Sequence, residues 1–296
     1  MAVTTRVLPE ARQRRIAGQR VDRLALGLGW YVLLAVLTLS FLVPTLWMVS
    51  SSLKASTEIF VHPIRWIPER PIWDNYPEAF RVQPLGRFAV NTGIVVIFAV
   101  LGTALSASAV AFSFARLRWP GRDIVFGMLL ASMMLPEVVT LVPKFIFFRQ
   151  LGWIGTFLPL TAPFWFGGTP FFIFLLRQFY RGLPFEMDEA ARIDGASSFR
   201  ILTQIIMPLS KPALTTVVIF SILANYNDFI HPLIYLNRQE LWTLSVGIRF
   251  FNDSYVARWE LIFAAATSML APMALLFFAA QRYFVQGIHL TGMGGR

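Results

Sequence analysis

Long apolar stretches without a single Asp, Glu, Lys or Arg follow one another along this chain. Four of them can each hold a membrane-spanning helix, because about 20 apolar residues cross the roughly 30 Å hydrocarbon core of a bilayer. Two further stretches, 124–143 and 212–237, contain one acid apiece, Glu137 and Asp228. We therefore predict an all-α integral membrane protein with six transmembrane helices. The predicted spans cover approximately residues 24–50, 88–115, 124–143, 155–177, 212–236 and 261–283.

Basic residues between the apolar stretches predict the orientation of the chain. The N-terminal tail, residues 1–23, carries six arginines and two acids, and the positive-inside rule places such a segment in the cytoplasm. Six spans return the C-terminal tail, residues 287–296, to the same side, so we expect both termini to be cytoplasmic. The first apolar run is longer than the roughly 7–15-residue hydrophobic region of a cleaved signal peptide, so we expect it to remain as an anchor. The membrane domain is thus predicted to cover residues 24–286.

The composition also favours a membrane protein over a soluble enzyme. Hydrophobic residues make up 56% of the 296 positions and charged residues 14%, against roughly 25% charged in soluble domains. The absence of cysteine excludes disulfides, cysteine-ligated zinc and iron–sulfur clusters. The three histidines, His62, His231 and His289, lie far apart, so neither a metal nor another cofactor is expected. The net charge of +10 is spread between apolar runs, so nucleic acid is not an expected partner.

No residue pattern for ATP binding or for catalysis is present in the sequence. A phosphate-binding loop ends in Gly-Lys, whereas Lys54, Lys144 and Lys211 follow leucine, proline and serine. An intramembrane enzyme would need a nucleophile with a base or a metal cluster, and the sequence contains neither arrangement. Hence we expect no enzymatic activity, and if ATP drives this protein, another chain must bind it.

The segment between the fourth and fifth predicted spans, residues 181–211, predicts two short helices separated by a sharp break. Pro184 suits a first helical turn, and the acids that follow it favour the positive end of a helix. Gly195 is placed to end this helix in a left-handed turn, and Ser197 or Ser198 can cap the second helix. The pattern leaves two interpretations open: a helix that lies in a groove of a soluble partner, or one that rests on the membrane surface.

The residues of this segment closely resemble the EAA loop of ATP-binding-cassette (ABC) importer permeases. The positions that carry the resemblance are Glu189, Ala190, Ala191, Asp194, Gly195, Ala196, Ile205 and Pro208. Five further segments extend it to the carbohydrate-uptake branch, specifically to the maltose-type second permease subunit: residues 51–60, 75–80, 114–123, 175–184 and 225–234. The departures are small, with Met207 in place of the usual leucine and Tyr226 in place of the common tryptophan.

This resemblance implies a permease bundle that forms the pathway for a sugar or related solute together with a homologous second permease. It also implies an ABC ATPase dimer in the cytoplasm, an extracytoplasmic solute-binding protein, and a bacterial or archaeal inner membrane as the location. A coupling helix would lie near residues 186–196 and dock in a cleft of the ATPase. The residues that the resemblance assigns to this coupling are Glu186, Glu189, Ala190, Ala191, Asp194, Gly195 and Ala196.

Polar residues inside two predicted spans are candidates for the translocation pathway, because ionisable groups at membrane depth usually face a bundle interior or water. Amides, carboxylates and an aromatic ring are also the groups that bind sugar hydroxyls and sugar faces. The candidate pathway residues are Glu137, Asn225, Tyr226, Asn227 and Asp228. The same groups could instead make structural hydrogen bonds between helices, and Glu137 could mark a wet helix end. They also leave an alternative function open, a self-sufficient ion-coupled secondary transporter that uses Asp228 or Glu137 as a proton or ion site.

Overall fold

The computed structural model describes residues 10–252 and 258–292, and these residues form helices and no strand. The two predicted tails lie partly outside the described residues, at positions 1–9 and 293–296. The prediction of an all-α fold is confirmed. The α-helices are α1 (Glu10–Ser51), α2 (Ser56–Ile59), α3 (Asn75–Val82), α4 (Leu85–Arg116), α5 (Arg122–Ser132), α6 (Glu137–Gln150), α7 (Leu158–Thr161), α8 (Pro170–Arg181), α9 (Glu186–Ile193), α10 (Ser198–Ile201), α11 (Met207–Leu209), α12 (Lys211–Asn227), α13 (Ile230–Tyr235), α14 (Leu244–Arg249) and α15 (Trp259–Gly292). Four shorter turns of 3-10 or π-helix complete them: η1 (Ala162–Trp165), η2 (Leu202–Ile206), η3 (Gln239–Leu241) and η4 (Phe250–Asn252).

Several of these helices are long and apolar enough to cross a membrane. Four stretches meet that condition by themselves: Gly29–Ser51, Leu85–Arg116, Leu158–Arg181 and Trp259–Ala279. Two bent helix pairs, α5 with α6 and the α10–α11 segment with α12, raise the number to as many as 6. This count, which covers the described residues, accommodates the six predicted spans.

The third predicted span, residues 124–143, is sharply bent. Helices α5 and α6 meet at an angle of 103° across a short break. Pro136 has no backbone N–H, and its ring disfavours a helical conformation at Leu135, so a continuous helix is disfavoured at this point. Pro136 has an extended conformation, with φ −60° and ψ 132°, and α6 begins at the next residue, Glu137. The bend therefore places the Glu137 carboxylate in the first turn of a new helix.

The fifth predicted span, residues 212–236, is divided at Asp228. Helix α12 ends at Asn227, the backbone of Asp228 is extended (φ −65°, ψ 122°), and α13 begins at Ile230. The Asp228 carboxylate accepts a hydrogen bond of 3.3 Å from the backbone N–H of His231. Such a local bond from a short acidic side chain competes with the helical backbone pattern. The division leaves the Asp228 side chain in the gap between two helices.

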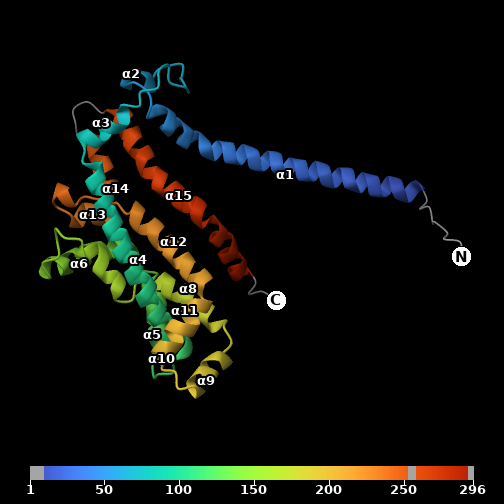
Figure 1. The fold of residues 1–296 in the computed structure, drawn as a ribbon, viewed down its shortest axis with the longest axis vertical. Coiled ribbons are helices and arrows are strands. Elements are labelled where there is room, and N and C mark those ends of the chain that lie inside the picture. Colours follow the sequence, from blue (N-terminus) through green and yellow to red (C-terminus); the bar gives the residue numbers. More distant parts are fainter. Residues whose placement is uncertain (1–9, 253–257, 293–296) are drawn as a thin grey trace.

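Helix α4 runs along the length of the bundle as its central element (Figure 1). Helices α8 and α12 pack along α4, while α15 packs against α12 and α3. The short helices α2 and α3 lie at one end of the bundle, and α9 and α10 lie at the other (Figure 1). Helix α1 projects away from this bundle, and its residues 29–44 are exposed. Since native proteins cover apolar surfaces of this extent with lipid or another chain, α1 needs such a cover.

A buried apolar cluster fastens the segment between α9 and α12 to the bundle. Ile201 and Ile206, from α10 and the π-helical turn after it, pack with Leu176 and Tyr180 of α8 and Val217 of α12. All five side chains are fully buried. Because protein interiors are close-packed and transmit strain, a displacement of this segment would also displace α8 and α12.

Candidate functional site

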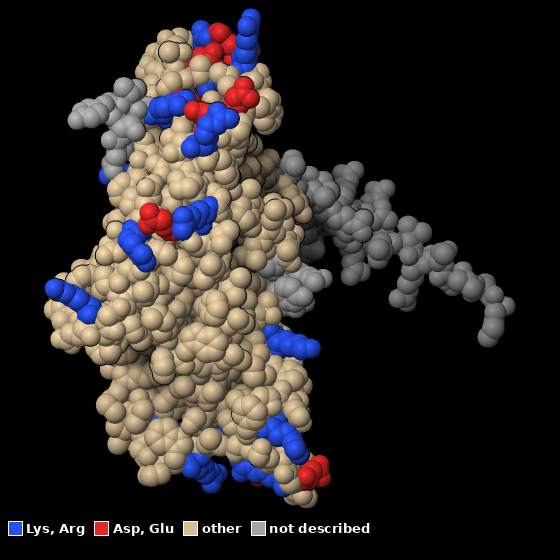
Figure 2. All heavy atoms as spheres, turned by 60° about the vertical axis from the view of Figure 1, so that its left-hand side comes forward, with Lys and Arg blue, Asp and Glu red and all other residues tan. Residues whose placement is uncertain are grey.

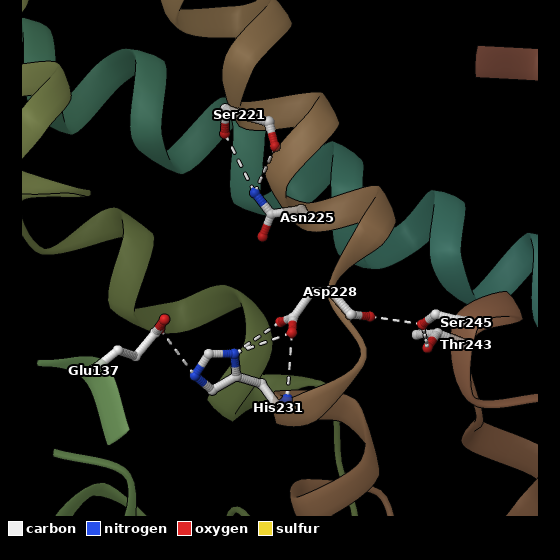
Figure 3. A network of polar contacts seen from close by, with 7 residues as sticks. All are labelled: Glu137, Ser221, Asn225, Asp228, His231, Thr243 and Ser245. Carbon is white, nitrogen blue, oxygen red and sulfur yellow. Dashed lines mark hydrogen bonds and ion pairs between the residues drawn. The ribbon is translucent and has the colours of Figure 1, made fainter. Parts of the chain in front are cut away.

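The two helix breaks bring three ionisable side chains together (Figure 3). His231 lies between two carboxylates, with its Nε2 atom 3.3 Å from Oε1 of Glu137 and its Nδ1 atom 3.0 Å from Oδ2 of Asp228. The carboxylates approach opposite nitrogens of the imidazole, so they do not converge on a single point as the ligands of one metal ion would. The arrangement links α6 to the break between α12 and α13.

A hydrogen bond from the first turn of α14 fixes the backbone of Asp228. Its backbone carbonyl accepts a bond of 2.6 Å from the hydroxyl of Ser245, which lies 3.0 Å from the hydroxyl of Thr243 (Figure 3). One turn before the break, the Asn225 amide donates to the backbone carbonyl of Ser221 at 2.8 Å. Ser245 therefore holds the backbone of Asp228, and Ser221 holds the side chain of Asn225.

A cavity of about 740 Å³ opens at this group of side chains. Its polar lining includes Glu137, Lys144, Asn225, Asp228 and His231. Its aromatic lining comes from α6, the loop that follows it, the region of η1 and α13: Phe147, Phe148, Trp153, Phe164, Phe166 and Tyr235. Small-molecule sites have this character, a mostly apolar wall of about 300–1,000 Å³ with a few convergent polar groups.

Two of the candidate pathway residues lie outside the lining of this cavity. The hydroxyl of Tyr226 donates a hydrogen bond of 2.7 Å to the backbone carbonyl of Met269 on α15. The amide of Asn227 donates to the backbone carbonyl of Leu223 at 2.9 Å. The cavity thus collects Glu137, Asn225 and Asp228, while Tyr226 joins α12 to α15 and Asn227 caps its own helix.

In the sequence, His231 is only one of three scattered histidines. The structure makes it the residue through which Glu137 and Asp228 are connected. Its position three residues after Asp228 is a local signal for a side-chain contact, because Asp228 lies just before α13 and His231 lies in its first turn. The contact with Glu137 carries no such signal, since it depends on how α6 folds back after Pro136.

The segment of the predicted coupling loop forms two short helices at one end of the bundle (Figure 1). Helix α9 ends before Gly195, whose φ of +77° is the predicted left-handed turn. The hydroxyl of Ser197 caps α10 by accepting a hydrogen bond of 3.4 Å from the backbone N–H of Arg200. At Ser210 the chain bends by 83° into α12. The predicted pair of helices with a break at Gly195 is therefore present.

The coupling residues assigned by resemblance differ in their exposure. Glu186, Glu189, Ala190, Asp194 and Gly195 are exposed, Ala196 is half-buried, and Ala191 is buried. Two large apolar side chains beside them are also exposed: Ile193, at 86% of its full surface, and Phe199. A short helix with exposed acids and an exposed isoleucine could dock in a groove of another protein.

A buried ion pair attaches α9 to α4. The Nε atom of Arg116 lies 3.8 Å from Oδ2 of Asp188, and these side chains retain 2% and 1% of their full surface. Arg116 also donates a hydrogen bond of 2.9 Å to the backbone carbonyl of Leu183, just before α9. Burial raises the pKa of the Asp188 carboxyl above its ordinary value, and Arg116 offsets this effect only in part. From the sequence, Asp188 is predicted only as an acid in the first turn of a helix.

Charged side chains are unevenly distributed over the face of the molecule drawn in Figure 2. Basic side chains gather at its lower end, both signs occur in its upper part, and the region between is largely uncharged. A lipid-facing surface has this appearance, because charged groups are costly in the hydrocarbon region.

The helix arrangement is that of a known class of membrane protein. The fold matches a chain in the crystal structure of a bacterial ABC transporter involved in the import of the acidic polysaccharide alginate, with a TM-score of 0.79 and 22% identity. The match covers 90% of this chain and 98% of that chain. The fold is therefore that of an ABC importer permease.

Sequence comparisons give the family. Residues 105–290 match the family described as binding-protein-dependent transport system inner membrane component. The chain is 29% identical over 265 residues to the sulfoquinovosyl glycerol transport system permease protein of Agrobacterium fabrum, covering 90% of this chain and 93% of that protein. It is 30% identical over 284 residues to the galactooligosaccharides transport system permease protein of Bacillus subtilis, covering 95% and 100%. The chain belongs to the binding-protein-dependent transport system inner membrane component family, and it is a transport permease.

Proposed function

We propose that this permease forms, with a homologous second permease, the pathway for a sugar or related solute in a bacterial inner membrane. An ABC ATPase dimer would drive it, and an extracytoplasmic solute-binding protein would deliver the solute. The relatives named above are permeases for sulfoquinovosyl glycerol and galactooligosaccharides. They and the matched structure are bacterial, so they support a bacterial membrane and give no support to an archaeal one. Both termini would then be cytoplasmic, on the same side as α9.

The observation that carries the coupling to ATP is the exposed helix α9 with its turn at Gly195. Its exposed acids, Glu186 and Glu189, and the exposed Ile193 give one end of the bundle a surface with both charged and apolar side chains. Helix-in-groove recognition uses such a combination of an apolar anchor and flanking charges. The buried side of α9, at Asp188 and Ala191, would transmit the motion of a docked ATPase into α4.

The pathway in this proposal follows the cavity between the two helix breaks. Glu137, Asn225 and Asp228 line it, so they are the proposed solute contacts of this subunit. Tyr226 would support the pathway by holding α12 against α15 through its bond to Met269, and Asn227 would stabilise the end of α12 through its bond to Leu223 of the same helix. No chemistry on the solute is required of these residues, because ATP hydrolysis on another chain supplies the energy.

The first test is a pull-down of the tagged full chain from its native host in a mild detergent, with co-purifying proteins identified by mass spectrometry. We expect a P-loop ATPase and a second permease. The variants Glu189→Lys and Gly195→Val should lose the ATPase but keep the second permease. The matched control is Glu240→Lys, an exposed acid in η3 far from α9 along the chain, and it should retain both partners.

The opposite result is equally specific. Recovery of the chain alone, with uptake that follows an ion gradient and ignores loss of the ATPase, would overturn ATP coupling. It would leave the ion-coupled secondary transporter, with the Glu137–His231–Asp228 group as its ion site. Loss of the second permease in both α9 variants would instead indicate misfolding, and size-exclusion profiles of the variants distinguish that case.

A further inference from the structure

The cavity at the helix breaks presents hydrogen-bond acceptors that are already held in position. Glu137 and Asp228 are both oriented by His231, which contacts one carboxylate with each ring nitrogen (Figure 3). The Glu137 side chain nevertheless keeps 70% of its full surface, so its carboxylate remains open to the cavity. A carboxylate has about four acceptor positions, of which a single imidazole contact uses one. A solute with several hydroxyl groups could donate to the remainder.

A second and independent observation is the hydroxyl group of Tyr235. This side chain lines the cavity and keeps only 1% of its full surface. Within the part of the chain that the structure describes, its buried hydroxyl has no hydrogen-bond partner. A buried polar group without a partner is costly, and a solute hydroxyl that reaches it through a small movement of the lining would satisfy it. The ring of Tyr235 lies 5.9 Å from that of His231, and both residues line the same cavity.

The charges of the lining indicate which solutes fit. The cavity lining contains two carboxylates, Glu137 and Asp228, and one lysine, Lys144, besides His231. Its charge is therefore negative when His231 is neutral, and no more than balanced when His231 is protonated. An acidic solute would meet no net positive charge here, while its own anion would face two acceptors that cannot donate to it. Neutral hydroxyl groups suit the same acceptors without this penalty.

The aromatic walls of the cavity also indicate which ligand fits it. Phe147, Phe148, Trp153 and Phe166 also line the cavity, and their rings are flat and apolar. Pockets that combine aromatic walls with a few fixed polar groups bind ligands that have both apolar faces and polar edges. A sugar ring is such a ligand, because its C–H groups form faces and its hydroxyl groups form the edge.

We propose that this cavity is a binding site for neutral sugars and that Glu137 and Asp228, positioned by His231, discriminate against acidic sugars. Tyr235 contributes a further hydrogen bond to the bound sugar. This inference rests on the proposed transport function, since it assigns a solute class to the pathway of this subunit. It also distinguishes the cavity from a general polar channel, which would not select by charge.

The test is saturation-transfer NMR on the purified transporter complex, because the method detects weak binding without the solute-binding protein. The probes are maltose and glucose as neutral sugars and glucuronate as the acidic counterpart of glucose. We expect saturation transfer to the neutral sugars and a response to glucuronate that is weaker by about tenfold, which corresponds to roughly 1.4 kcal/mol. In the double variant Glu137→Gln/Asp228→Asn, this preference should largely disappear.

Two further variants separate site effects from general ones. Tyr235→Phe removes only the hydroxyl and should weaken binding of both classes while leaving the preference for neutral sugars unchanged. Glu69→Gln neutralises an exposed acid outside the cavity lining and should change nothing. Size-exclusion profiles and ATP hydrolysis of each variant complex show that it is assembled.

Three outcomes would overturn the inference. They are equal or stronger binding of glucuronate by the unmodified complex, no binding of any probe, and a preference that survives in the Glu137→Gln/Asp228→Asn variant. None of them bears on the proposed coupling to ATP, which fails only if the ATPase does not co-purify or uptake does not depend on it. The two proposals can therefore fail separately.

Discussion

Arg116, in the last turn of α4, and Asp188, in the first turn of α9, form an ion pair that is almost completely removed from solvent. The pair joins the central helix of the bundle to the helix proposed to dock into the ATPase. Removing charges from water is costly, and a buried pair is retained only if each partner compensates the other. The loss of either charge should therefore destabilise the packing of both helices.

Replacement of Arg116 by methionine should strongly destabilise the protein. The variant leaves the Asp188 carboxylate buried without its cation and removes the hydrogen bond to Leu183. Breaking a buried pair in this way costs about 3–5 kcal/mol. We expect a lower thermal unfolding midpoint of the purified protein in detergent. Adding Asp188→Asn to Arg116→Met should recover part of the loss, because the neutral amide removes the unpaired charge. A double variant no better than Arg116→Met would show that the charge of Asp188 is not the cause.

The pair also predicts a dependence of stability on pH. Burial raises the pKa of Asp188 above its ordinary value near 3.8. At a pH between the ordinary pKa of the unfolded chain and the raised pKa of the folded protein, the folded protein binds more protons at this carboxyl than the unfolded chain does. The free energy of unfolding therefore falls as the pH rises from the lower pKa to the higher one. Unfolding midpoints of the wild type and of Asp188→Asn, measured from pH 4 to pH 7, give the comparison. The wild type should lose stability relative to the variant as the pH rises, and parallel curves would contradict the prediction.

The long charge-free stretches and the turn at Gly195 could be predicted from sequence, because both depend on local composition. Twenty apolar residues need a membrane or a large core wherever they occur, and a left-handed turn favours glycine in any fold. Pro136 is also a local signal, but the sequence predicts only that the helix is weakened there. The angle of 103° between α5 and α6 depends on what each helix packs against.

The contacts of the candidate site could not be predicted in the same way. His231 meets Glu137 only because α6 folds back toward α13, and Arg116 meets Asp188 only because α9 returns beneath α4. Both pairs join residues far apart in the sequence, so neither periodicity nor capping residues indicate them. Tyr226 illustrates the reverse case. Its neighbours in the sequence suggested a pathway residue, while its hydroxyl is used by the backbone of Met269.

Replacement of Gly247 by alanine should destabilise the protein although alanine is the better helix former. Gly247 lies inside α14, where alanine would by itself gain about 1 kcal/mol. A Cβ atom at this position would overlap the ring of Phe88, which is fully buried and has no room to move. Overpacking of this kind costs about 1–3 kcal/mol. We expect a lower unfolding midpoint, whereas Gly93→Ala in α4, where nothing lies near the new methyl group, should not lower it.

Replacement of Gly195 by alanine tests whether the turn after α9 acts through its backbone conformation alone. No atom lies within 4 Å of the position that a Cβ would occupy, so the new methyl group has space. The φ of +77° is nevertheless unfavourable for a residue with a side chain, by about 1–2 kcal/mol. The variant should therefore lower the unfolding midpoint in detergent and weaken retention of the ATPase in a pull-down, because α9 would lose its preferred ending. The matched control is Gly127→Ala in α5, where a Cβ also has open space and the backbone is helical. Equal midpoints for the two variants would mean that the left-handed turn is not what holds α9 in place.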